Sequence, residues 1–133
     1  MPHLIIEYSA NVADVVDVPD LVGAVHAAAL ATGTAPLDAL RTRAVARDHY
    51  AIADRDPSNK FIAVTARLGA GRSDSEKDSL VEVLMAALDE FLGEEQDTIM
   101  LSVEYQEIDP AHRINKNNLR AVIAERSKDI ETR

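Results

Sequence analysis

The sequence predicts an α/β fold of the α+β type, in which two β-α-β repeats form one four-stranded sheet with two helices on one face. Three observations predict it: a β-rich run opens each half of the chain, a helical apolar pattern follows each run, and a second strand pattern follows each helix. Parallel strands joined by a helix form a right-handed crossover, so two such units side by side give a single sheet. Since 133 residues are about one domain long, we expect a single domain over residues 1–133.

The first repeat spans about residues 2–49. It opens with the β-rich run Leu4–Ile6, in which alternate side chains point to opposite faces of a strand. A helix begins near Asp17, which can accept a hydrogen bond from the first turn, and Gly33 ends that helix. A second strand is predicted over about residues 39–48.

The second repeat, about residues 60–107, has the same order. It opens with a strand of alternating residues, and a glycine-rich turn follows that strand. Ser73 and Glu76 then form the S-x-x-E pattern of a capping box, which opens a helix that ends at Gly93. A fourth strand is predicted from Thr98 to the end of the repeat.

The tail, residues 109–133, has no counterpart in the first half. Its pattern predicts a turn over 115–118 and then a short polar helix over about 119–130. With both repeat helices on one face, the other face of the sheet is bare. Because the strands that open the two repeats carry apolar residues on both faces, we expect other copies of the chain to cover the bare face.

The composition excludes several classes of function. A net charge of −9 argues against nucleic acid and anionic membranes as partners. The absence of cysteine excludes disulfides and thiol nucleophiles. The start of the chain lacks the pattern of a signal peptide, and no apolar run approaches the ~20 residues of a membrane span, so a cytoplasmic location is expected. If the ligand is an anion, arginines must create a positive pocket in an acidic protein.

Pro2 directly precedes the first strand and is the candidate catalytic base. Removal of Met1, which is usual before a small residue, would leave Pro2 with a terminal secondary amine. An α-amino group has a pKa of about 8, and an apolar pocket or nearby arginines lower it further. Such a group can take a proton from one atom and return it to another. Proline is also common at position 2, so an ordinary second residue is the alternative interpretation.

Three arginines are candidates for binding a carboxylate. Arg41 and Arg43 lie two residues apart on the predicted second strand and so project from one face, in a row that Arg47 extends. Arg72 lies in the glycine-rich turn at the start of the second helix, where backbone N–H groups also favour an anion. For each of them a solvated surface arginine is the alternative.

The remaining histidines, serines and carboxylates do not form a recognisable metal site or hydrolase motif. The four histidines show no metal-ligand spacing, so no metal site is expected. No serine has the G-x-S-x-G context of a hydrolase nucleophile. Glu7 lies on the first strand and either tunes the pKa of Pro2 or faces solvent.

Taken together, these features resemble the 5-carboxymethyl-2-hydroxymuconate isomerase family of the tautomerase superfamily, from Pro2 to about Asn118. The segments that carry the resemblance are Met1–Ser9, Ala31–Gly33 with Pro36–Leu37, Leu40–Arg43, Gly69–Ser73, and the pair Asn115 and Asn118. The resemblance implies a tautomerase-like fold and a homotrimer with its sheets facing the threefold axis. It also implies Pro2 as the catalytic base, Arg41 and Arg72 as substrate-binding residues, and Arg43 as an addition to that pair.

The resemblance further implies an isomerase of aromatic catabolism that ketonises a carboxylated 2-hydroxymuconate-type dienol. The proton moves from the 2-hydroxyl end of the conjugated system to carbon 5, and this chemistry needs no cofactor or metal. One alternative is another activity of the superfamily, a hydratase-type dehalogenase or a decarboxylase of small unsaturated acids. That activity needs a carboxylate to activate water, and Glu7 is the nearest candidate. A non-enzymatic oligomer that retains the fold is the other alternative.

Overall fold

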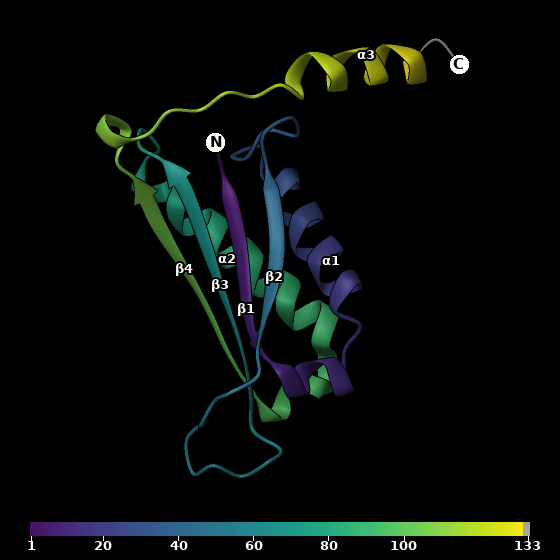
Figure 1. Ribbon diagram of the computed structural model, residues 1–133, viewed down its shortest axis with the longest axis vertical. Helices are drawn as coiled ribbons and strands as arrows, with labels where there is room; N and C mark the ends of the chain where they lie inside the picture. Colours follow the sequence, from purple (N-terminus) through teal and green to yellow (C-terminus); the bar gives the residue numbers. More distant parts are fainter. Residues whose placement is uncertain (132–133) are drawn as a thin grey trace.

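The computed structural model describes residues 1–131, in which one mixed sheet carries two long helices on one face (Figure 1). The last two residues of the expected tail, 132–133, lie outside the described residues. The strands are β1 (His3–Ser9), β2 (Arg41–Arg47), β3 (Lys60–Gly69) and β4 (Ile99–Ile108), and the α-helices are α1 (Val18–Ala31), α2 (Asp74–Leu92) and α3 (Arg120–Glu131).

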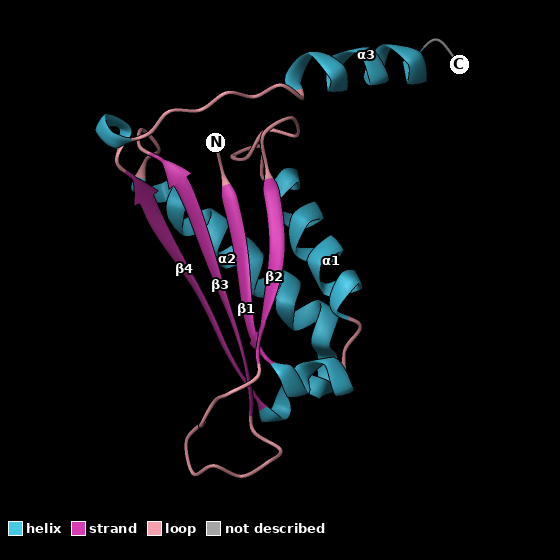
Figure 2. Ribbon diagram, viewed as in Figure 1, coloured by secondary structure: helices cyan, strands magenta, loops and turns pink. Residues whose placement is uncertain are grey.

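The sheet has the order β2-β1-β3-β4 and consists of two β-α-β units. β1 pairs with β2 in parallel, β3 pairs with β4 in parallel, and the two units meet where β1 and β3 run antiparallel. Figure 2 shows α1 and α2 packed behind the same side of the sheet. The predicted fold class is therefore confirmed.

The core lies between the sheet and these two helices. Leu4 and Ile6 of β1 are fully buried against the helices, as their alternation predicts. The helices supply the opposite wall at helical spacing. Its buried residues are Leu21, Val25 and Ala29 from α1, and Leu80, Leu84, Leu88 and Leu92 from α2.

Side-chain caps set where the two repeat helices begin. The Asp17 carboxylate accepts a hydrogen bond from the Asp20 backbone N–H at 3.0 Å. In the capping box, the Glu76 backbone N–H donates to the Ser73 hydroxyl at 3.1 Å, and the Ser73 N–H donates to the Glu76 carboxylate at 3.2 Å. Because Ser73 is the N-cap and α2 starts at Asp74, Arg72 lies directly before the entrance of the helix.

Local turns move some boundaries from the predicted ones. β2 begins at Arg41 and not near Ala39, because the N–H groups of Ala39 and Leu40 both donate to the Pro36 carbonyl in a turn. Short 3-10 helices that the sequence patterns did not predict span Ala10–Asp14, Gly93–Thr98 and Pro110–His112.

The face of the sheet away from the helices is open. Ile5, Phe61 and Ala63 are only partly buried there, and Met100 keeps 62% of its surface exposed. Figure 1 also shows α3 beyond the end of the sheet, separated from it by an extended segment. Within residues 1–131, none of the helices has the length and apolar character that would let it cross a bilayer.

Candidate active site

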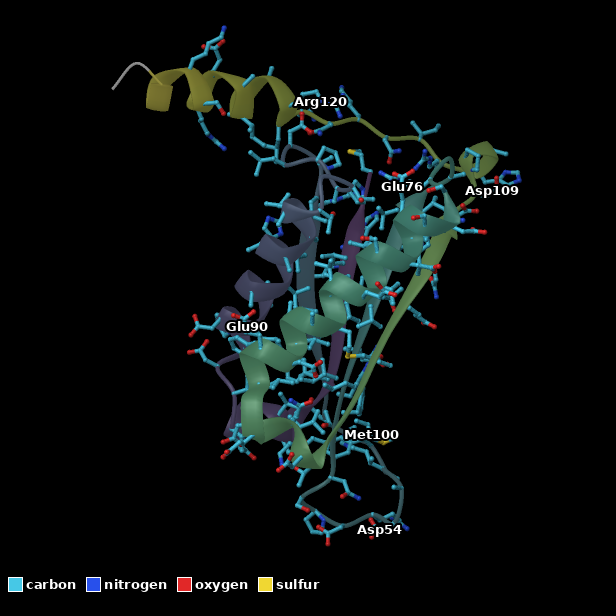
Figure 3. All side chains as sticks on the ribbon, turned by 180° about the vertical axis from the view of Figure 1, so that it is seen from behind. Asp54, Glu76, Glu90, Met100, Asp109 and Arg120 are labelled. Carbon is cyan, nitrogen blue, oxygen red and sulfur yellow. The ribbon has the colours of Figure 1, made fainter. Side chains whose placement is uncertain are left out.

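The candidate site lies at the end of the sheet where β1 and β2 begin and β3 and β4 end. Pro2 precedes β1, Gly69 ends β3, and the chain from Asp109 onward follows β4. Side chains from these segments enclose a pocket of about 210 Å³. Its lining residues are Met1, Pro2, Pro36, Ala39, Gly69, Ala70, Arg72, Arg113 and Arg120. Glu76 and Arg120 mark this end of the molecule in Figure 3.

Pro2 is buried, and it lines this pocket together with Met1. The Pro2 carbonyl accepts hydrogen bonds from the Arg41 backbone N–H at 3.3 Å and from Arg41 Nη2 at 3.5 Å. With Met1 attached, the Pro2 nitrogen is a tertiary amide, and the free amine is that of Met1. Burial, followed by the charges of Arg113, Arg41 and Arg72, lowers the pKa of the Met1 amine below its ordinary value of 8.0. A terminal amine at this end of the sheet thus lies in a field that favours its neutral form.

Arg72 also lines the pocket, and backbone carbonyls fix its guanidinium. Nη1 donates to the Gly69 carbonyl at 3.1 Å, and Nη2 donates to the Thr34 carbonyl at 3.0 Å. A guanidinium has five N–H donors, so other donors remain for an anion. Pro2 and Arg72, two of the candidate site residues, therefore line the same pocket.

Arg41 and Arg43 both reach His3 on the open face of the sheet. Arg41 Nη2 lies 3.0 Å from His3 Nε2, and Arg43 Nη1 lies 3.1 Å from His3 Nδ1. Partial burial and then the charges of Arg41, Arg43 and Arg67 lower the pKa of His3 to about 4, so the ring is neutral at pH 7. Neither arginine is among the residues that line the Pro2 pocket. Arg41 contacts the Pro2 carbonyl and lines a neighbouring hollow that Met1 also lines, whereas Arg43 lies two residues further along β2.

Arg113 and Arg120 line the pocket but were missed by the sequence reasoning. Arg120 pairs with the Asp38 carboxylate at 2.9 Å, and Asn117 Nδ2 donates to the Asp38 carbonyl at 2.7 Å. These contacts tie the tail to the loop before β2. Arg113 packs on Gly69, and its Nη1 is buried without a hydrogen-bond partner among the described residues. The tail has no counterpart in the first repeat, so no sequence pattern indicated that it returns to the site.

The pocket is positively charged although the whole chain carries −9. Three arginines line it, and the residues described as lining it include no Asp or Glu. Glu7 does not lie there, because it forms an ion pair with Arg47 at 2.7 Å further along the sheet. Within residues 1–131 no group of three or more His, Cys, Asp or Glu side chains could hold a metal ion. The site suits an anionic ligand and proton transfer.

Comparison with known proteins agrees with this geometry. Residues 2–123 match the family model described as 5-carboxymethyl-2-hydroxymuconate isomerase. The chain is 31% identical over 124 residues to the 5-carboxymethyl-2-hydroxymuconate Delta-isomerase of Escherichia coli, covering 92% of this chain and 98% of that one.

Solved structures show the same fold. The crystal structure of a 5-carboxymethyl-2-hydroxymuconate isomerase from Deinococcus radiodurans R1 superposes with a TM-score of 0.83 and 33% identity, over 92% of this chain and 93% of that one. A fused 4-OT described as a symmetric trimer is similar in fold alone, with a TM-score of 0.62 and 16% identity over 86% and 93% of the two chains. The chain therefore belongs to the 5-carboxymethyl-2-hydroxymuconate isomerase family.

Proposed function

We propose that this chain is a cofactor-independent isomerase that ketonises a carboxylated 2-hydroxymuconate-type dienol, with the amine of Pro2 as its catalytic base. The observation that carries the proposal is the position of Pro2, which is buried in a pocket lined by arginines at the start of β1. Membership of the isomerase family supports the reaction class.

The chemistry requires a base that is neutral near pH 7. The pKa of the terminal amine is lowered, so its neutral form persists to lower pH than in an ordinary peptide. Once Met1 is removed, the terminal amine is that of Pro2, and we expect the same burial and neighbouring arginines to lower its pKa as well. It takes the proton of the 2-hydroxyl group, and negative charge spreads over the conjugated system. The proton then returns to carbon 5, which leaves the ketone and regenerates the neutral amine.

The arginines stabilise the charge that develops and orient the substrate. Arg72 is fixed at the pocket wall and binds a substrate carboxylate. Arg41 lies beside the Pro2 carbonyl and supports the negative charge near the amine. Arg43 is a proposed addition to this pair, and its contact at 3.1 Å with His3, which Arg41 also contacts, supports that role.

The alternative activities fit the site less well. A hydratase-type dehalogenase or a decarboxylase that activates water needs a carboxylate beside the proline. The residues described as lining the pocket include none, and Glu7 is bound to Arg47. A non-enzymatic oligomer would give no role to a buried proline within reach of Arg41 and Arg72.

The proposed activity is tested by adding 2-hydroxymuconate, a dienol, to the chain that begins at Pro2 and following its ultraviolet absorbance. We expect ketonisation well above the spontaneous rate, without added metal or cofactor. The same preparation should leave an acetylenic acid unhydrated. Hydration of that acid without ketonisation of the dienol would replace the proposal with the hydratase alternative.

We also propose a homotrimer in which the open face of each sheet packs against the other subunits. A hollow of about 390 Å³, lined by residues that include Phe61 and Met100, gives this face an apolar surface to bury. The fused 4-OT of the same fold is a symmetric trimer. A small carboxylate-bearing molecule remains the proposed substrate, and the cytoplasmic location remains a prediction.

Replacing Ile5 with Glu is expected to dissociate the trimer, because a charge would be buried at the centre of the open face. Sedimentation velocity should give a trimer for the wild type and a monomer for Ile5→Glu. Ala27→Glu, on the exposed side of α1, is the matched control and should stay trimeric. A trimer that survives Ile5→Glu would place the interface elsewhere.

A further inference from the structure

Arg113 differs from the other two arginines that line the pocket because no described carboxylate or carbonyl pairs with its guanidinium. Arg120 pairs with Asp38, and Arg72 donates to two backbone carbonyls. Nη1 of Arg113 is buried, yet no described residue accepts a hydrogen bond from it. A buried N–H group without an acceptor is unfavourable, and Arg113 lines the pocket, so its unpaired guanidinium favours an anion there.

The Arg113 guanidinium packs closely against Gly69. A Cβ atom at position 69 would lie 2.7 Å from Nη1, 2.8 Å from Nη2 and 3.1 Å from Cζ of Arg113. The guanidinium therefore occupies the space that any larger residue at position 69 would need. Because the Gly69 carbonyl also accepts from Arg72 Nη1, one residue brings two guanidinium groups to the same wall.

Two cations on one wall of a small pocket repel each other unless an anion lies between or beside them. The described lining residues supply no carboxylate for this purpose. Arg113 also lies near the reacting end of the chain: after burial, its charge is the largest cause of the lowered pKa of the Met1 amine. A ligand with more than one carboxylate would complete this arrangement.

We propose that Arg113 binds a second carboxylate of the substrate, beyond the one bound by Arg72, and thereby makes the pocket selective for dicarboxylates over monocarboxylates. The inference rests on the proposed function for the identity of the reaction. It concerns a residue from the tail of this chain, at a position that the sequence patterns did not single out.

The test uses two stable six-carbon dienoic acids that cannot be ketonised. Muconate carries a carboxylate at both ends, whereas sorbate has a methyl group in place of one of them. Calorimetric titration of the chain that begins at Pro2 should give tighter binding of muconate. In Arg113→Gln the preference for muconate should fall about tenfold to a hundredfold, the usual effect of a hydrogen bond between charged groups.

Two further variants separate charge from position. Gly69→Ala keeps Arg113 but displaces its guanidinium, and should reduce the preference as Arg113→Gln does. Arg113→Lys keeps a cation and should restore part of the preference. Arg126→Gln, an exposed arginine of α3, removes the same charge elsewhere and should leave the preference unchanged. If Arg113→Gln does not fold, Gly69→Ala and Arg113→Lys give the answer.

An unchanged preference in the folded Arg113 and Gly69 variants would overturn the inference, as would a wild type that binds the two acids equally or binds neither. Ketonisation of 2-hydroxymuconate by the same wild-type preparation reports separately on the proposed function. Turnover without a preference for dicarboxylates refutes only the role of Arg113, and the preference without turnover refutes only the reaction.

Discussion

A chain that keeps residues in front of Pro2 is expected to lose about a hundredfold to ten-thousandfold of its turnover, the range that a general base contributes. The reason is covalent: an amide at Pro2 has no basic lone pair, while the pocket and its arginines stay intact. The comparison needs two preparations, one that begins at Pro2 and one with an uncleavable extension. Intact mass verifies each terminus, and kcat for dienol ketonisation is then measured.

The matched control is Pro2→Ala in a chain from which Met1 has been removed. That chain starts with a primary amine in the same pocket, so its turnover should fall between those of the two other preparations. In the wild type, kcat/KM should rise with pH as the Pro2 amine loses its proton, because the neutral amine is the active form. The arginines that lower the pKa of the Met1 amine should shift this rise to lower pH than for an ordinary terminal amine. Equal turnover with and without the extension would exclude the Pro2 amine as the base.

Arg72→Gln is expected to lower kcat/KM for the dienol about tenfold to a hundredfold. The variant removes a charged donor to the substrate carboxylate, and charge-assisted hydrogen bonds have effects of this size. Both kcat and KM should worsen, because the same contact binds the substrate and orients it toward the amine. Steady-state kinetics at several dienol concentrations separates the two parameters.

Stability must be measured beside activity, since Arg72 also holds the Gly69 and Thr34 carbonyls. A modest fall in Tm is expected, and kinetics are measured well below it. Arg126→Gln removes the same charge on exposed α3 and should change neither parameter. If a folded Arg72→Gln variant kept its full kcat/KM, Arg72 would have only a structural role.

Local patterns predicted most of the fold. Strand alternation placed Leu4 and Ile6 in the core, and the Asp17 cap and the Ser73–Glu76 capping box fixed the starts of both repeat helices. These signals are readable because each depends on residues a few positions apart. The start of β2 was wrong by two residues, because the Pro36 turn takes the N–H groups of Ala39 and Leu40.

The candidate site was only partly predictable, because sequence patterns report on residues a few positions apart. Pro2 and Arg72 are adjacent to recognisable elements, a strand start and a helix cap, so sequence spacing indicated both. Arg113 and Arg120 reach the pocket through contacts between distant segments, such as the Arg120 ion pair with Asp38. No local pattern encodes such a contact. Glu7, a candidate from its place on the first strand, forms an ion pair with Arg47 of the neighbouring strand and does not line the pocket.

The most direct test of the account is covalent labelling by a substrate-like acid that carries an alkylating group. A neutral amine in the pocket is the expected nucleophile, so the chain that begins at Pro2 should gain one label. Peptide sequencing by mass spectrometry should place that label on the Pro2 nitrogen, and a chain with residues in front of Pro2 should not be labelled there. A label on another side chain, with ketonisation lost to the same extent, would contradict the role of Pro2.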